Sequence, residues 1–184
     1  KKAMTLNDSA GVKLKSGDLD GAELDLLSAL EYSGQDPKLR KNLGAIHYEK
    51  GVRAVRASNF YDAQKYLTSS LGIDPGNEEY RKAFAGAVSL EADSRAKIGQ
   101  NEDALRLYKK AAVYDEKNIS AWLQAAHYAW STQHLDLGRE YLDRAKALDP
   151  SDKNVLILEE KLKNNFNESE SGGRASLHFI LSAA

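Results

Sequence analysis

The sequence predicts an all-α fold, an α-solenoid of about four helix-turn-helix repeats with a C-terminal capping helix. The first observation is a pair of small residues, seven positions apart, that recurs at intervals of 41, 41 and 34 residues. The pairs are Ala22 and Ala29, Ala63 and Ser70, Ala104 and Ala111, and Gly138 and Ala145. Large apolar residues repeat on the same helix face, at Leu26, Leu67, Tyr108 and Leu142 and again at Tyr32, Ile73, Tyr114 and Leu148. A unit of this length cannot bury an apolar face alone and must stack on its neighbours.

A turn precedes the second helix of each unit, the one that carries the small residues. Asp18 and Asn59 are good N-caps because a short side chain with an oxygen accepts the free amide hydrogens of the first turn, whereas Gln100 and His134 are poorer ones. Proline cannot continue a helix, so Asp-Pro closes two of the units, at residues 74–75 and 149–150. The predicted helices are residues 3–16, 19–33, 37–57, 59–72, 77–98, 101–114, 118–131, 134–148 and 151–165.

Two of the repeat intervals are seven residues longer than the third, which is close to two turns of helix. We place the extra residues in the first helices of units two and three, within residues 37–44 and 78–84. The segment "GVRAVRASN" from Gly51 repeats "AGVKLKSGD" from Ala10, so the added turns come before the ordinary repeat. Each long helix is then expected to be unbroken, with Gly51 as its weakest point because glycine disfavours helix interiors.

The repeat resembles that of the tetratricopeptide repeat family, in which a helix-turn-helix unit has small residues early and late in its second helix and a terminal proline. The matching segments are "SGDLDGAELDLLSAL", "ASNFYDAQKYLTSSLGIDP", "IGQNEDALRLYKKAAVYD" and "TQHLDLGREYLDRAKALDP". With their partner helices they cover residues 3 to about 150. The resemblance implies a right-handed superhelix whose first helices line a concave face that binds other proteins.

The C-terminal part of the sequence divides into a capping helix and a tail. Residues 151–165 are amphipathic, with Val155, Leu156, Leu158 and Leu162 on one side, as expected for a helix that covers the last repeat. We therefore assign residues 3–165 to the solenoid. Residues 166–184 are predicted to be a polar linker and an extended, strand-like tail with alternating apolar residues.

Three interpretations of this tail stay open. It is the first strand of a following domain, a disordered or added tail, or a peptide that docks on the repeats, because an isolated strand is not stable. Proteins with tetratricopeptide repeats before a gluzincin-type peptidase domain can open the second domain with a similar "HF" strand, here His178-Phe179. The His-Glu-x-x-His motif of such a peptidase is not in the sequence.

The composition excludes several classes of function. No cysteine is present, and no two of the four histidines stand four apart on a helix, so the sequence predicts no metal site. Phosphate-binding glycine loops and nucleophile motifs are also missing, which predicts that the chain is not an enzyme and has no cofactor. A net charge of −1 favours neither nucleic acid nor acidic membranes as partners, and no apolar run is long enough to span a bilayer. We expect a soluble protein of the cytoplasm or the periplasm.

The predicted binding site is the groove lined by the first helices. The repeat places these candidate residues there: Tyr48, Val52, Arg56, Asp93, Lys97, His127 and Trp130. Lys15, Arg56 and Lys97 share one column, which indicates either complements to the helix dipole or a cationic stripe for an acidic peptide. Family members that grip chaperone C-terminal carboxylates use a Lys/Asn clamp. The clamp columns here hold Asn7, Gly11, Tyr48, Val52 and Ser89, so that ligand is not expected.

The two tryptophans are predicted to differ in role. Trp122 falls on the helix-packing column, whereas Trp130 falls towards the groove and is the strongest hot-spot candidate, with a core position as the alternative. We predict a non-catalytic scaffold or adaptor that binds a protein segment in the concave groove. The alternative is a recruiting N-terminal domain of a larger multidomain enzyme, such as a peptidase, whose catalytic part lies beyond this sequence. Self-association through the end repeats is a third hypothesis.

Overall fold

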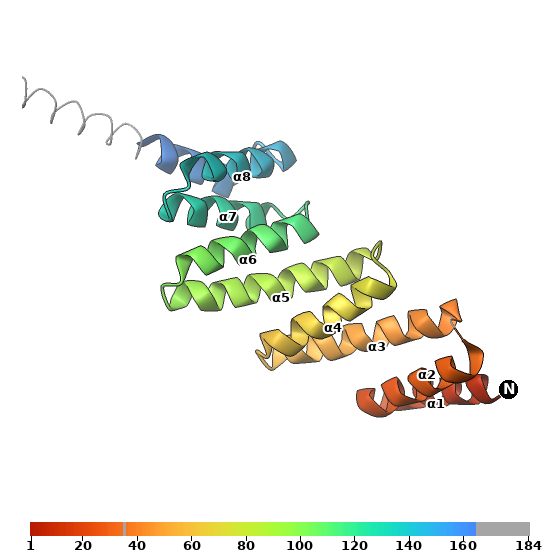
Figure 1. Cartoon of the computed structure of the whole chain (residues 1–184). Coiled ribbons are helices and arrows are strands. Elements are labelled where there is room, and N and C mark those ends of the chain that lie inside the picture. Colours follow the sequence, from red (N-terminus) through yellow and green to blue (C-terminus); the bar gives the residue numbers. More distant parts are fainter. Residues whose placement is uncertain (35, 165–184) are drawn as a thin grey trace, which may run out of the picture.

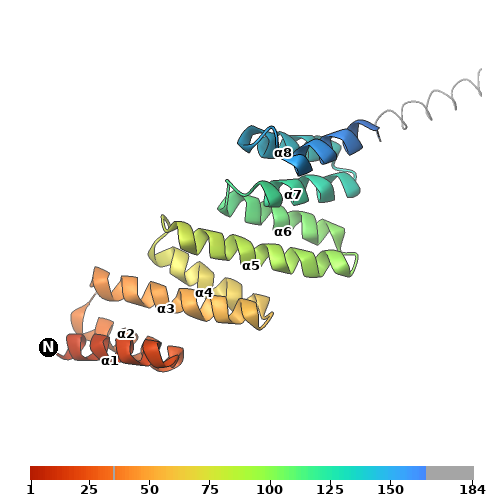
Figure 2. The same ribbon diagram turned by 180° about the vertical axis from the view of Figure 1, so that it is seen from behind.

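The structure, a computed structural model, describes residues 1–34 and 36–164. Consecutive helices form antiparallel hairpins that stack in chain order along one axis (Figures 1 and 2). The labelled helices are α1 Lys2–Ser16, α2 Leu19–Ser33, α3 Pro37–Arg56, α4 Phe60–Ile73, α5 Glu78–Lys97, α6 Asn101–Tyr114, α7 Ile119–Ser131 and α8 Leu135–Leu148. Residues 153–164 are also helical, and no strand occurs among the described residues. The all-α solenoid of helical hairpins is thus confirmed.

The eight labelled helices begin and end within one residue of the predicted bounds, and the ninth predicted helix is described from residue 153 to residue 164. Helices α3 and α5 each run for 20 residues without a break, whereas α7 has 13. The seven-residue insertions therefore lengthen two first helices in phase, as predicted. The predicted linker and tail at residues 166–184 lie outside the described residues.

The turn inside each hairpin repeats as regularly as the helices do. Residues 17, 58, 99 and 133 all have a positive φ, and two of them are not glycine, Ser58 at 55° and Gln133 at 66°. The Asp18 and Asn59 side chains accept hydrogen bonds from the backbone N–H groups of Gly21 and Asp62. Gln100 and His134 make no such cap, as predicted. The backbone geometry of the turn is therefore the same in all four hairpins, whereas the side-chain N-cap hydrogen bond forms in only two of them.

Small residues allow the two helices of a hairpin to approach closely. Every member of the two predicted small columns is buried. A third column, which the sequence analysis did not separate, lies in the first helices at Ala10, Gly51, Ala92 and Ala126, and it is buried too. Because these alanine, glycine and serine side chains are small, the side-chain ridges of one helix can enter the grooves of the neighbouring helix.

Gly51 is the tightest of these contacts. A Cβ added at Gly51 would lie 2.5 Å from Leu67 Cγ, and Leu67 is completely buried in α4. Helix α3 is unbroken at Gly51, and the missing side chain is what lets α4 pack against α3. Gly86, in the middle of α5, has no atom within 4 Å of an added Cβ.

Substituting these two glycines is expected to give opposite results. Gly51→Ala should lower the free energy of unfolding by about 1 to 3 kcal/mol, because the overpacked Leu67 must move and the helix-propensity gain is smaller. Gly86→Ala should raise it by about 0.5 to 1 kcal/mol, since alanine is preferred in an open helix interior. Urea denaturation of both variants beside the wild type measures the difference. Equal stabilisation by both changes would contradict the close helix contact at Gly51.

The two large apolar columns are buried to different extents. Leu26, Leu67, Tyr108 and Leu142 are all buried. In the second column Tyr32 is 57% exposed and Leu148 41% exposed, so these two residues do not fill grooves between helices as the repeat pattern predicts. The Tyr32 hydroxyl accepts a hydrogen bond from Lys2 Nζ, at the start of α1.

The helix at residues 153–164, which we call the capping helix, buries a narrower face against α8 than predicted. Val155 and Leu162 are buried, and Lys146 of α8 pairs with Glu159 across the contact at 3.0 Å. Leu156 is 49% exposed, which corrects its predicted place on the buried face. One residue turns a helix by about 100°, so Leu156 lies well away from the direction of Val155.

A polar layer lies at the boundary between the two apolar clusters of the solenoid core. One apolar cluster joins α1, α2 and the start of α3, and a second extends from α4 to residue 162. Between them, Glu23 of α2 accepts hydrogen bonds from Lys50 Nζ at 2.5 Å and faces His47 Nε2 at 2.8 Å, both on α3. Lys50 also pairs with Asp20 at 2.6 Å and lies over the Tyr66 ring. The contact between α2 and α3 therefore combines apolar packing at the start of α3 with charged pairs at His47 and Lys50.

Candidate protein-binding face

Three predicted site residues, Tyr48, Val52 and Arg56, meet in one cavity. They lie on successive turns of α3 and line a space of about 550 Å³. Its other walls come from α1, from the turn after it, and from α5. The remaining lining residues are Leu14, Gly17, Leu19, Ala45, Glu49, Arg53, Asn77, Glu79 and Tyr80. The first helices of three consecutive hairpins therefore contribute to a single hollow.

Tyr48 forms the aromatic wall of this cavity. Its ring stacks on Tyr80 of α5 at a centroid distance of 5.2 Å, and its hydroxyl donates a hydrogen bond to Glu79 Oε1 at 3.1 Å. Partial burial, together with the nearby Glu79 carboxylate, raises the pKa of the Tyr48 hydroxyl above its usual value. The side chain is thus fixed in orientation while part of its surface stays open, which is typical of interface anchors.

The charges at the cavity are of two kinds. Arg53 is committed to the fold, because its guanidinium donates to the backbone oxygen of Gly17 at 2.9 Å. Arg56 is exposed, and its side chain has no ion pair or hydrogen bond among the residues that the structure describes. Arg56 can therefore meet a ligand without breaking an existing contact.

Asp93 takes part in packing between helices. It accepts a hydrogen bond from the Tyr108 hydroxyl, and the Tyr108 ring stacks on Tyr128 of α7 at 5.2 Å. Burial and this carboxylate raise the pKa of Tyr108. His127 lies edge-on to Tyr128 at 5.0 Å and is exposed, as is Lys97. None of Asp93, Lys97 and His127 lines the cavity at Tyr48.

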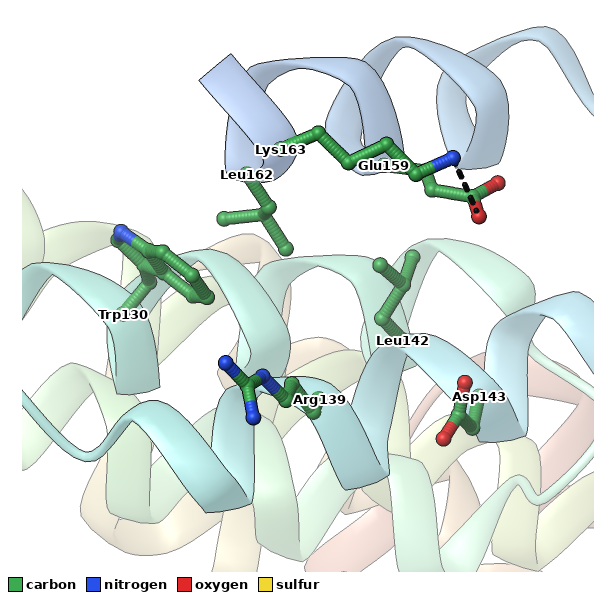
Figure 3. A pocket seen from close by; sticks show the side chains of 7 residues that line it. All are labelled: Trp130, Arg139, Leu142, Asp143, Glu159, Leu162 and Lys163. Carbon is green, nitrogen blue, oxygen red and sulfur yellow. Dashed lines mark ion pairs between the residues drawn. The ribbon is translucent and has the colours of Figure 1, made fainter. Parts of the chain in front are cut away.

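Trp130 lines a different cavity, shown in Figure 3. This space of about 450 Å³ lies between the end of α7, α8 and the capping helix. Trp130, Leu142 and Leu162 form its apolar surface. The charged residues around it are Arg139, Asp143, Glu159 and Lys163, of which Glu159 and Lys163 pair at 3.2 Å. Trp130 is half-buried, so it combines a packing role with an accessible edge.

Trp122 is buried, and its indole N–H donates to the backbone oxygen of Glu116 at 2.9 Å.

The sequence analysis missed residues on the added turns of α3. Counting back along the helix from Tyr48, Lys41 is seven residues earlier and Lys38 three residues before that, which places all three on one face. The added turns have no counterpart in the first repeat, so a comparison of repeat columns could not find them. Helical phase alone would have done so.

Neither a cluster of potential metal ligands nor a membrane-spanning helix occurs in the described residues. No group of three or more His, Asp or Glu residues in residues 1–34 and 36–164 is arranged to hold a metal ion. In the same residues, no helix has both the length and the apolar character needed to cross a membrane.

Comparison with known proteins gives structural similarities only. No protein-family model matches the sequence. The chain is similar to the tetratricopeptide repeat domain of Arabidopsis OM64, with 20% identity and a TM-score of 0.45 over 68% of this chain and 98% of that one. A tetratricopeptide repeat protein from Parabacteroides merdae has 19% identity and a TM-score of 0.46, over 92% of this chain and 63% of that one. The first such domain of Spaghetti (RPAP3), solved with the HSP90 peptide SRMEEVD, has 15% identity and a TM-score of 0.46 over 69% of this chain and 95% of that one. The binding properties of this chain are therefore inferred from its own residues.

Proposed function

We propose that this chain, whose repeats resemble tetratricopeptide repeats, is a non-catalytic scaffold that binds a segment of another protein across its first helices. The observation that carries the proposal is the cavity between α1, α3 and α5, where Tyr48, Val52 and Arg56 offer aromatic, apolar and cationic surface side by side. A half-buried aromatic residue beside an unpaired arginine is the composition that dominates binding energy in protein interfaces.

The proposed face continues from this cavity towards the C-terminal hairpins. Lys97 and His127 are exposed and extend the polar rim, and Trp130 provides a second apolar anchor at the capping helix. Asp93 acts indirectly in this proposal, because its bond to Tyr108 fixes α5 against α6. A ligand that reaches both cavities would span all four hairpins.

A site-specific photo-crosslinker tests the location of the face. Val52 in the full chain is replaced by benzoylphenylalanine, and the same substitution at Tyr61 of α4, which is 81% exposed, serves as the control. In extracts of the source cells we expect protein adducts from position 52 and none from position 61. Adducts from position 61 alone would contradict the proposal.

Two substitutions test the anchors against a partner recovered in that way. Trp130→Ala should weaken its binding by about 2 kcal/mol or more, because an aromatic hot spot loses most of its contact area. Arg56→Glu should weaken it as well if the ligand is acidic. Isothermal titration calorimetry with the purified partner measures both effects, and circular dichroism checks that the variants are folded. Wild-type affinity in both folded variants would place the site elsewhere.

A further inference from the structure

One face of α3 carries a continuous stripe of accessible residues. Lys38, Lys41, Ala45, Tyr48, Val52 and Arg56 follow one another at steps of three or four positions, which keeps them on the same side of a helix. All six are exposed or half-buried. The face of α3 that packs on α4 is a different one, because it contains Gly44 and Gly51, which meet Ile73 and Leu67. The stripe, defined by these six residues, therefore lies outside the hairpin contact.

The stripe has cations at both ends and apolar surface in the middle. Helix α3 contains six basic residues and one acidic residue, Glu49. Lys50 and Arg53 are used within the fold, by Glu23 and by the Gly17 carbonyl. Within residues 1–34 and 36–164, the side chains of Lys38, Lys41 and Arg56 have no ion pair or hydrogen bond. Their charge is therefore available to a partner.

The charge at the start of α3 does not serve the helix itself. Helix α3 has no acidic residue in its first turn, whereas α5 has Glu78 and Glu79 there. Lys38 stands in that first turn, where the positive end of the helix dipole disfavours a cation. The Asp36 carboxylate is used as the N-cap, accepting from the Lys38 backbone N–H at 2.8 Å. Lys38 therefore adds nothing to the stability of its own helix, and its charge is left for a partner.

We infer that the part of the ligand bound at α3 is a peptide segment in which apolar residues are flanked on both sides by acidic residues, lying along this helix. This inference rests on the proposed function and adds the chemistry of its partner. The apolar part would enter the cavity at Tyr48 and Val52, and the acidic parts would meet Lys38 and Lys41 at one end and Arg56 at the other. The added turns of α3 supply the first of these cationic ends, so the insertion enlarges the binding site.

The length of the stripe sets the length of the segment. Lys38 and Arg56 are 18 positions apart, which corresponds to about 27 Å along a helix. An extended peptide covers that distance with about eight residues. Pairing of the two acidic ends of the peptide with the two basic ends of the stripe also fixes the position of the peptide along the groove. The same attraction speeds association at low salt.

A random library of displayed twelve-residue peptides, selected against the full chain, tests this inference. We expect the enriched peptides to carry acidic residues on both sides of an apolar residue. A synthetic peptide of the most enriched sequence should bind at least tenfold more weakly to the double variant Lys38→Glu/Lys41→Glu and to Arg56→Glu. The control is Arg40→Glu, because Arg40 is exposed on the same helix but off the stripe, and its side chain has no partner among the described residues. This control should change the affinity less than twofold.

Two further readouts separate recognition from a structural effect and from other ligands. The double variant should melt at or above the wild-type temperature, since it replaces cations with acids near a helix N-terminus. Enriched peptides without acidic residues would overturn the inference, and so would an equal loss of affinity in Arg40→Glu. In either case the proposed binding face still stands if Val52→Ala weakens binding. If Val52→Ala and the stripe variants all bind as the wild type does, both the inference and the proposed function fail. Phosphatidylserine vesicles or single-stranded DNA that bind through Lys38 and Lys41, when no peptide does, would also overturn it in favour of a phosphate ligand.

Discussion

Phe84→Ala is expected to lower the free energy of unfolding by about 4 kcal/mol. Phe84 is 2% exposed in α5, its ring packs against Tyr114 at 4.4 Å, and Lys110 Nζ lies 4.8 Å from its centre. Deletion of a buried aromatic ring removes its transfer energy and leaves a cavity that close-packed neighbours fill only in part. Because stacked repeats stabilise one another, the loss should be felt in the hairpins on both sides.

Urea denaturation followed by circular dichroism measures this loss. Tyr61→Ala is the matched control, since Tyr61 is also aromatic and on a helix but is 81% exposed. The control should unfold as the wild type does. If Phe84→Ala were no less stable than Tyr61→Ala, the continuous core from α4 to the capping helix would be refuted.

Lys50→Met is expected to lower the free energy of unfolding by about 2 kcal/mol. This loss is smaller than that for breaking a fully buried ion pair, because Asp20 and part of Glu23 reach solvent. The Lys50 side chain is 11% exposed and pairs with Glu23 at 2.5 Å and with Asp20 at 2.6 Å. Its removal leaves the Glu23 carboxylate with His47 as its remaining partner in this layer. Lys82→Met is the control, because Lys82 and Glu78 form an exposed pair whose loss should not change stability measurably.

The contribution of this network should depend on pH in a defined direction. Partial burial opposes ionisation of Glu23, but the hydrogen bonds from Lys50 and His47 outweigh it, so the pKa of the carboxyl lies below its usual 4.5. A lowered native pKa adds stability above the unfolded-state pKa, and this stability is lost as the pH falls through the native one. The wild type and Lys50→Met should therefore differ most near pH 7 and converge below about pH 4. A constant difference across this range would contradict the network.

The arrangement of hairpins could be predicted because small residues repeat where helices touch. Ala63, Ser70 and Ala104 share their columns with residues of the other units, and all are buried. The extension of α3 and α5 was also predictable, since seven residues preserve helical phase. The role of Gly51 could not be predicted from propensity, because its contact with Leu67 depends on the neighbouring helix.

The candidate site was predictable only in part. Tyr48, Val52 and Arg56 share one cavity because a single helix carries them at four-residue steps. The surroundings of Trp130 depend on Leu142 and Leu162, which come from different helices and which a column in the sequence cannot bring together. Asp93 was expected to face the groove, but its partner Tyr108 lies on the following helix. Side-chain contacts between residues of different helices, such as the bond between Asp93 and Tyr108, could therefore not be predicted from the repeat columns.

The central claim is that ligands bind the first helices, and backbone amide chemical shifts test it most directly. The full chain, labelled with ¹⁵N, is titrated with the most enriched peptide. The account predicts the largest shift changes in α3 between Ala45 and Arg56, with smaller ones in α5 and little change in α4 and α6. Large changes in α2, α4, α6 and α8 with α3 unaffected would contradict it.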